Sequence, residues 1–132
     1  AQFLAENFRA LGLKVHYPGL PDHPQHELLN SLMNPGYGYG GMIAIDVGSL
    51  ERANQLMTRM QQEKVGYLAV SLGYFKTLFS SPGHSTSSEI PVEEREKMGL
   101  SDGLVRFSVG LDNDIGHSLE RIKRCLEDAG SI

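Results

Sequence analysis

The sequence predicts an α/β fold, a small sandwich in which helices pack on a sheet of about four strands. Segments with apolar residues at helical spacing alternate along the chain with short, β-rich apolar segments. The 132 residues, of which 40% are hydrophobic and 21% charged, suit one domain with a core of its own. No internal repeat or long linker divides the chain.

The N-terminal segment, residues 1–11, is expected to form a helix that ends at Gly12. Its apolar stripe consists of Leu4, Phe8 and Leu11. Because no capping residue precedes the stripe, we expect this helix to be the remainder of a longer one. Lys14–Tyr17 is a candidate strand, and the three prolines of the loop Tyr17–Pro24 exclude regular structure there.

A second helix is expected after this loop, with Asp22 as its N-cap and Gln25 at capping-box spacing. Its apolar residues are Leu28, Leu29, Leu32 and Met33. The helix should end near Asn34–Pro35, because the residue before a proline disfavours helical geometry. A cluster of glycines follows at residues 36–41.

The middle of the chain predicts two strands on either side of a long helix. Met42–Val47 and Tyr67–Leu72 are apolar and rich in β-forming residues. Ser49 is expected to cap the helix between them, whose stripe consists of Ala53, Leu56, Met57 and Met60. Gly73–Phe79 is expected to be a turn or a short helix, and Ser80–Ser88 a serine-rich loop.

The last third of the chain predicts a charged helix, Pro91–Met98, then a strand, Leu104–Val109, and finally an amphipathic helix. The stripe of the closing helix consists of Ile115, Leu119, Ile122 and Leu126. Asp112, Asn113 and Asp114 precede it, where negative charge stabilises a helix N-terminus.

Composition excludes several classes of protein. The net charge of −4 argues against a nucleic-acid binder, which needs clustered basic residues. No apolar run approaches the roughly 20 residues that span a bilayer, and no secretory signal opens the chain, so no membrane partner is expected. A single cysteine, Cys125, excludes an internal disulfide framework and fits a reducing, cytoplasmic compartment.

Two patterns are candidates for a binding site. Arg106 lies on the strand face opposite to Phe107, where its guanidinium can bind a carboxylate with two hydrogen bonds. Ser71 and Leu72 end the strand that begins at Tyr67, and groups at strand ends are free to bind ligands. The spacing alone leaves a solvated arginine and an ordinary turn as alternatives.

Three other patterns are not expected to form a functional site. His23 and His26 stand three residues apart but lack a third metal ligand, so no metal site is expected. The glycine cluster precedes a strand, whereas a phosphate-binding loop follows one and opens a helix. Cys125 belongs to no recognisable Cys-His catalytic set and is expected to be a partly buried structural thiol.

Four blocks of the sequence, in this order and spacing, resemble the C-terminal domain of the Cys/Met-metabolism enzymes that use pyridoxal 5′-phosphate (PLP). The blocks are residues 17–26, 40–42, 69–73 and 103–110. The resemblance extends over nearly the whole chain. It implies that Arg106 binds the α-carboxylate of the substrate and that Ser71 and Leu72 assist.

Within this family the chain is most similar to plant-type methionine γ-lyases. Relatives that use cystathionine often have Glu where this chain has Val70, and an apolar neighbour suits an S-methyl group better than an ammonium group. Ser85–Glu89 replaces the commoner Met-Thr-His motif. The resemblance implies an α,γ-elimination from a sulfur amino acid that releases a thiol, ammonia and a 2-oxo acid. A cystathionine γ-synthase or γ-lyase remains an alternative.

The family also binds PLP through a lysine in an N-terminal domain. None of the five lysines here has that sequence context: Lys14, Lys64, Lys76, Lys97 and Lys123. We therefore expect residues 1–132 to be a single C-terminal domain, truncated at its N-terminal side, that contains no catalytic or cofactor-binding residue and is inactive alone. Its own N-terminal domain and a homotetramer are the implied partners. A free-standing amino-acid-binding module is the second alternative.

Overall fold

The computed structural model describes residues 1–85, 87–111 and 113–132. Its centre is one five-stranded sheet with the strand order β1-β2-β5-β4-β3. All neighbouring strands are antiparallel except β3 and β4, which are parallel. The strands are β1 (Lys14–His16), β2 (Met42–Asp46), β3 (Tyr67–Leu68), β4 (Leu78–Ser80) and β5 (Leu104–Ser108). The predicted α/β class is confirmed.

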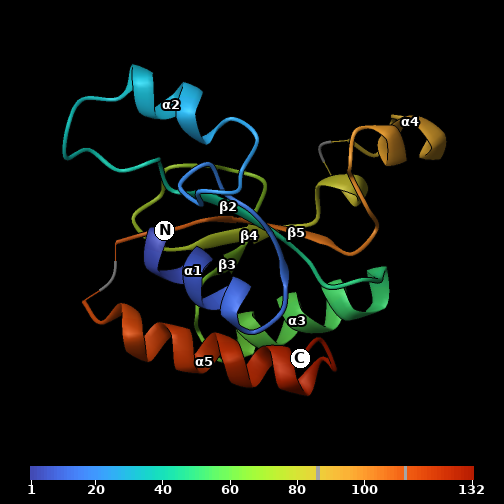
Figure 1. The fold of residues 1–132 in the computed structure, drawn as a ribbon. Coiled ribbons are helices and arrows are strands. Elements are labelled where there is room, and N and C mark those ends of the chain that lie inside the picture. Colours follow the sequence, from blue (N-terminus) through green and yellow to red (C-terminus); the bar gives the residue numbers. More distant parts are fainter. Residues whose placement is uncertain (86, 112) are drawn as a thin grey trace.

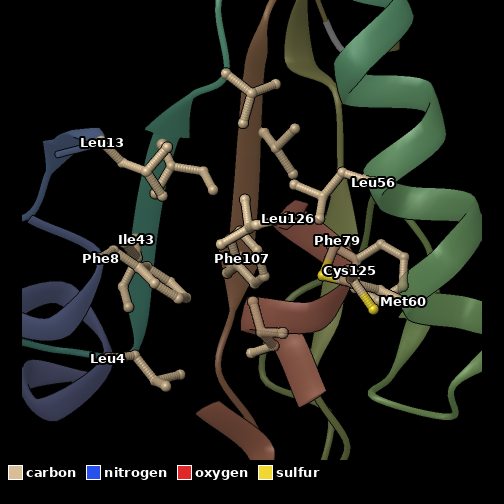
Figure 2. Packing of buried hydrophobic residues seen from close by; sticks show 14 of the residues in the cluster. Leu4, Phe8, Leu13, Ile43, Leu56, Met60, Phe79, Phe107, Cys125 and Leu126 are labelled. Carbon is tan, nitrogen blue, oxygen red and sulfur yellow. The ribbon is translucent and has the colours of Figure 1, made fainter. Parts of the chain in front are cut away.

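Three helices cover one face of this sheet, which we call the helical face (Figure 1). They are α1 (Gln2–Ala10), α3 (Leu50–Gln62) and α5 (Ile115–Asp128). Figure 2 shows how their side chains meet those of the strands in the core. Phe107 of β5 lies at the centre of the core, with ring contacts to Phe8 of α1 and to Phe79 of β4. Cys125 is buried there as an unpaired thiol, and burial raises its pKa.

The opposite face of the sheet, which we call the open face, carries much less structure. Figure 1 shows α2 (His26–Leu32) and α4 (Val92–Lys97) on this side. Helix α2 buries none of its residues. A short 3₁₀ helix, η1 (Pro82–His84), joins β4 to the segment that contains α4. On β2 and β5, Met42 and Arg106 of the open face are at least partly accessible, whereas Leu104 and Ser108 are buried.

The cap predicted at Ser49 is confirmed, and Asp114, expected to stabilise the N-terminus of α5 by its charge, also caps that helix. The Ser49 hydroxyl accepts a hydrogen bond from the Arg52 amide at 3.3 Å, and the Asp114 carboxylate accepts one from the His117 amide at 2.9 Å. The capping box predicted for α2 is wrong: the helix begins one residue after Gln25, without a side-chain cap. Asp22 instead pairs with Arg9 of α1. The proposed role of Asp112 lies outside the described residues.

The sheet has one strand more than expected, because Leu78–Ser80 forms β4 within the segment predicted as a turn and a loop. Three buried residues suffice to pair with β5, and a run so short shows no periodicity. The predicted strand Tyr67–Leu72 is shortened to β3. Its remainder leaves the sheet to cross the open face. Thr86, in the predicted serine-rich loop, lies outside the described residues.

Candidate functional site

Arg106 projects from the central strand β5 onto the open face, as its alternation with Phe107 predicts. Its register partners are Ala44 on β2 and Ser80 on β4, so the guanidinium stands near the middle of the sheet. Phe107 is fully buried in the core, whereas Arg106 is half-buried. The strand thus anchors a cation on a rigid support while leaving part of it accessible.

The Arg106 guanidinium is held by backbone oxygens. Its Nη2 atom donates hydrogen bonds to the carbonyl oxygens of Ala69, at 3.3 Å, and Ser71, at 3.1 Å. The Nε atom is buried without a partner. Burial lowers the pKa of this guanidinium, although the group stays charged at neutral pH. An ionised carboxylate is the ligand that would satisfy the remaining donors best.

We call residues 69–77 the rim: residues 69–73 lie against Arg106 and Ser108, and residues 75–77 lead into β4 beside Gly110 and Leu111. The Gly73 amide donates to the Ser108 hydroxyl at 3.1 Å, and the Leu111 amide donates to the Phe75 carbonyl oxygen at 2.8 Å. The approach at Gly110 is so close that a Cβ atom would stand 2.4 Å from the carbonyl carbon of Lys76. These contacts fix the rim against the strand that carries Arg106.

The predicted site residues lie together, but not all through the atoms that the sequence suggests. Ser71 contacts Arg106 through its backbone carbonyl oxygen, and its side chain is exposed. Leu72 and Val70 are exposed on the same rim. Sequence reasoning missed Ala69 and Ser80; the pairing of β4 with β5, which would reveal Ser80, was hidden because β4 itself was not predicted.

A cavity of about 340 Å³ adjoins this site and extends toward α3. Its walls include Ala69 and Val70 of the rim, Ser80 of β4, and His84 and Ser85 at η1. Arg106 does not line the cavity itself, but Ala69 accepts a hydrogen bond from Arg106 and Ser80 is its cross-strand partner, so the cavity and the guanidinium are neighbours.

The residues present do not form a site for a Schiff-base cofactor or a metal. Four of the five lysines are exposed, and the half-buried Lys123 pairs with Glu120 on the outside of α5 at 3.3 Å. No group of three or more His, Cys, Asp or Glu residues in the described part of the chain could hold a metal ion. Within the same residues, no helix is long and apolar enough to cross a membrane.

The fold and the site define an α/β domain that presents a half-buried arginine, Arg106, on the open face of its sheet. The sequence profile of the family described as Cys/Met metabolism PLP-dependent enzymes matches residues 1–125. The chain therefore belongs to this family, whose cofactor is PLP.

Curated relatives and solved structures agree with this membership. The chain is 52% identical to the methionine gamma-lyase of Arabidopsis thaliana over 111 residues, which are 83% of this chain and 25% of that protein. It is 40% identical to the cystathionine gamma-lyase of Bacillus subtilis over 114 residues, 82% of this chain and 28% of that protein. The crystal structure of yeast cystathionine gamma-lyase superposes with a TM-score of 0.88 at 34% identity, over 98% of this chain and 33% of that one. The chain thus spans about a quarter to a third of the length of these relatives.

Proposed function

We propose that this chain is the substrate-orienting, C-terminal domain of a PLP-dependent C–S lyase that acts on a sulfur amino acid. The observation that carries the proposal is Arg106, a half-buried guanidinium on the open face with donors left to bind a carboxylate. Every amino-acid substrate carries an α-carboxylate, and a fixed arginine holds that group in one orientation.

In this proposal the chain binds and orients but performs no bond cleavage. Arg106 receives the α-carboxylate, and the rim around Ser71 and Leu72 closes one side of the bound substrate. PLP supplies an electron sink when it is bound, and it requires a lysine in a site that the described residues do not provide. The cofactor and its lysine would therefore belong to an N-terminal domain of the full enzyme.

We infer that the substrate resembles methionine and undergoes α,γ-elimination to a thiol, ammonia and a 2-oxo acid. Val70 supports this choice because its isopropyl group, exposed beside the cavity, offers no charge to an ammonium-bearing substrate. The likeness to the Arabidopsis methionine gamma-lyase favours the same reaction. Cystathionine is the second candidate substrate, favoured by the superposition on yeast cystathionine gamma-lyase.

The distribution of exposed apolar side chains supports a protein partner on the Arg106 side. Helices α3 and α5 expose no large hydrophobic side chain to solvent. On the open-face side, α2 and the rim expose Leu28, Leu32, Leu72, Tyr74 and Phe75. Exposed patches of this kind mark surfaces that other protein covers. The N-terminal domain of the same enzyme, within a homotetramer in the cytoplasm, is the partner we propose.

The test is the substitution Arg106→Ala in the full-length enzyme. We expect kcat/KM to fall by about 100-fold or more, because a lost charge-assisted hydrogen bond to a desolvated carboxylate costs roughly 3 kcal/mol. Binding of a substrate analogue that lacks the carboxylate should change by less than about threefold. Arg59→Ala, which removes a surface arginine paired with Asp128, is the control. An unchanged kcat/KM in Arg106→Ala would refute the role.

A further inference from the structure

A buried arginine fastens the 3₁₀ helix η1 to the chain that follows it. Arg95 of α4 is only 9% exposed, although it stands on a short and otherwise exposed helix. Its Nη1 atom donates to the Gly83 carbonyl oxygen at 2.7 Å and lies 3.5 Å from the Asp102 carboxylate. The same Asp102 oxygen lies 3.2 Å from Nε2 of His84. We call Arg95, Asp102 and His84 the latch.

The latch leaves little room for movement around η1. A Cβ atom at Gly83 would stand 2.9 Å from Nη1 of Arg95, so the arginine sits directly against the backbone. Desolvating a guanidinium is costly unless it is paired and hydrogen-bonded. Gly83 and Asp102 pair with Nη1 of Arg95, whereas its Nε atom is buried without a partner. Loss of the arginine would release the backbone of η1 from α4.

The part of the chain that the latch holds is one wall of the cavity beside Arg106. His84 and Ser85 line this cavity together with Val70 and Ala69. Ser85 is further tied by its hydroxyl, which donates to the Ser81 carbonyl oxygen at 2.7 Å. Because His84 and Ser85 are part of the lining, a displacement of η1 would change the width of this cavity.

We propose that Arg95 is a positioning residue that holds this wall and thereby sets how long a thioether side chain the enzyme accepts. The inference rests on the proposed function, because it needs a substrate carboxylate at Arg106. Arg95 does not touch the substrate; it acts through Gly83, His84 and Ser85 on the shape of the cavity.

The test compares methionine with ethionine, which is longer by one methylene group, in the full-length enzyme and its Arg95→Met variant. One methylene in a fitted pocket changes kcat/KM by about 10- to 200-fold. With the wall released, we expect the methionine-to-ethionine ratio of kcat/KM to change by at least about fivefold. Arg95→Lys keeps the positive charge and should move the ratio less. It also replaces Arg95→Met if that variant fails to fold. Arg9→Met, on α1, which does not line the cavity, removes a surface arginine paired with Asp22 and should leave the ratio unchanged.

Amide hydrogen exchange across residues 81–85 supplies a readout that does not depend on turnover. Arg95→Met should speed exchange at His84 and Ser85, whose amides donate to the carbonyl oxygens of Ser81 and Pro82. Faster exchange with an unchanged substrate ratio would overturn the specificity role, as would an equal fall of kcat/KM for both substrates. If the unmodified enzyme converts neither amino acid, the proposed function itself fails. Unchanged amide exchange in Arg95→Met would separately show that Arg95 does not hold η1 in place.

Discussion

Val70 stands at the boundary between the carboxylate site and the cavity. It precedes Ser71, whose carbonyl oxygen holds Arg106, and its side chain is exposed along the cavity wall. In the full-length enzyme, Val70→Glu should shift the ratio of kcat/KM from methionine toward cystathionine by about tenfold. The new carboxylate would pair with the distal ammonium group of cystathionine, and a close charge pair of this kind is worth about 1.5 kcal/mol or more.

A neutral substitution of similar size separates charge from shape at this position. Val70→Gln adds nearly the same volume as Val70→Glu without the charge, so it should not favour cystathionine. If the two variants change the substrate ratio equally, the ammonium group is not recognised here and the interpretation of Val70 is wrong.

At the level of single residues, the sheet face to which a side chain points was predictable from the sequence, whereas the atoms through which residues contact each other were not. Alternation along β5 places Arg106 opposite to Phe107, and the structure confirms that placement. The contact made by Ser71 uses its backbone oxygen, which any residue would supply. The latch escaped prediction altogether because Arg95 and Asp102 meet Gly83 across a fold that their spacing does not reveal.

Among the elements, helices α5 and α2 both carry apolar side chains, but only those of α5 are buried in the core. Leu126 of α5 is fully buried in the core, whereas Leu32 of α2 is 74% exposed. In the 132-residue chain, Leu126→Ala should lower the free energy of unfolding by about 2–5 kcal/mol, because it leaves a cavity. Leu32→Ala should change it by less than about 0.5 kcal/mol. Urea denaturation of the two variants, followed by circular dichroism, measures both values. A comparable loss in Leu32→Ala would show that α2 packs against the domain.

The long amphipathic elements were predictable and the short ones were not. Helices α3 and α5 extend over 13 and 14 residues, enough for a repeated apolar stripe and a polar cap. Strands β3 and β4 contain two and three residues, so pairing with neighbours, rather than local pattern, decides their structure. Leucines on α2 satisfy the same helical spacing as a core stripe, and only the structure shows that the described residues leave Leu28 and Leu32 exposed.

At the scale of the whole molecule, the two faces of the sheet have different roles. The helical face contains the core that stabilises the domain, and the open face contains Arg106, the rim and the exposed apolar side chains of α2. A binding arginine surrounded by exposed leucines and aromatic rings suits a surface that is completed by further protein. In the proposed function, the helical face stabilises the domain and the open face contributes one side of the substrate site.

The isolated 132-residue chain should therefore release no thiol from methionine, even when PLP is added. The described residues offer no enclosed lysine, and exposed amines would bind the aldehyde only transiently. A thiol reagent measures release, with the full-length enzyme as the positive control. Circular dichroism establishes that the isolated chain is folded, so that inactivity cannot be attributed to unfolding.

Mixing the folded chain with a separately produced N-terminal, cofactor-bearing domain should restore release. Leu28→Asp combined with Leu32→Asp should weaken that restoration by about tenfold or more, because charged groups would have to be buried at the interface. Thiol release by the chain alone would contradict the division of roles between the two domains.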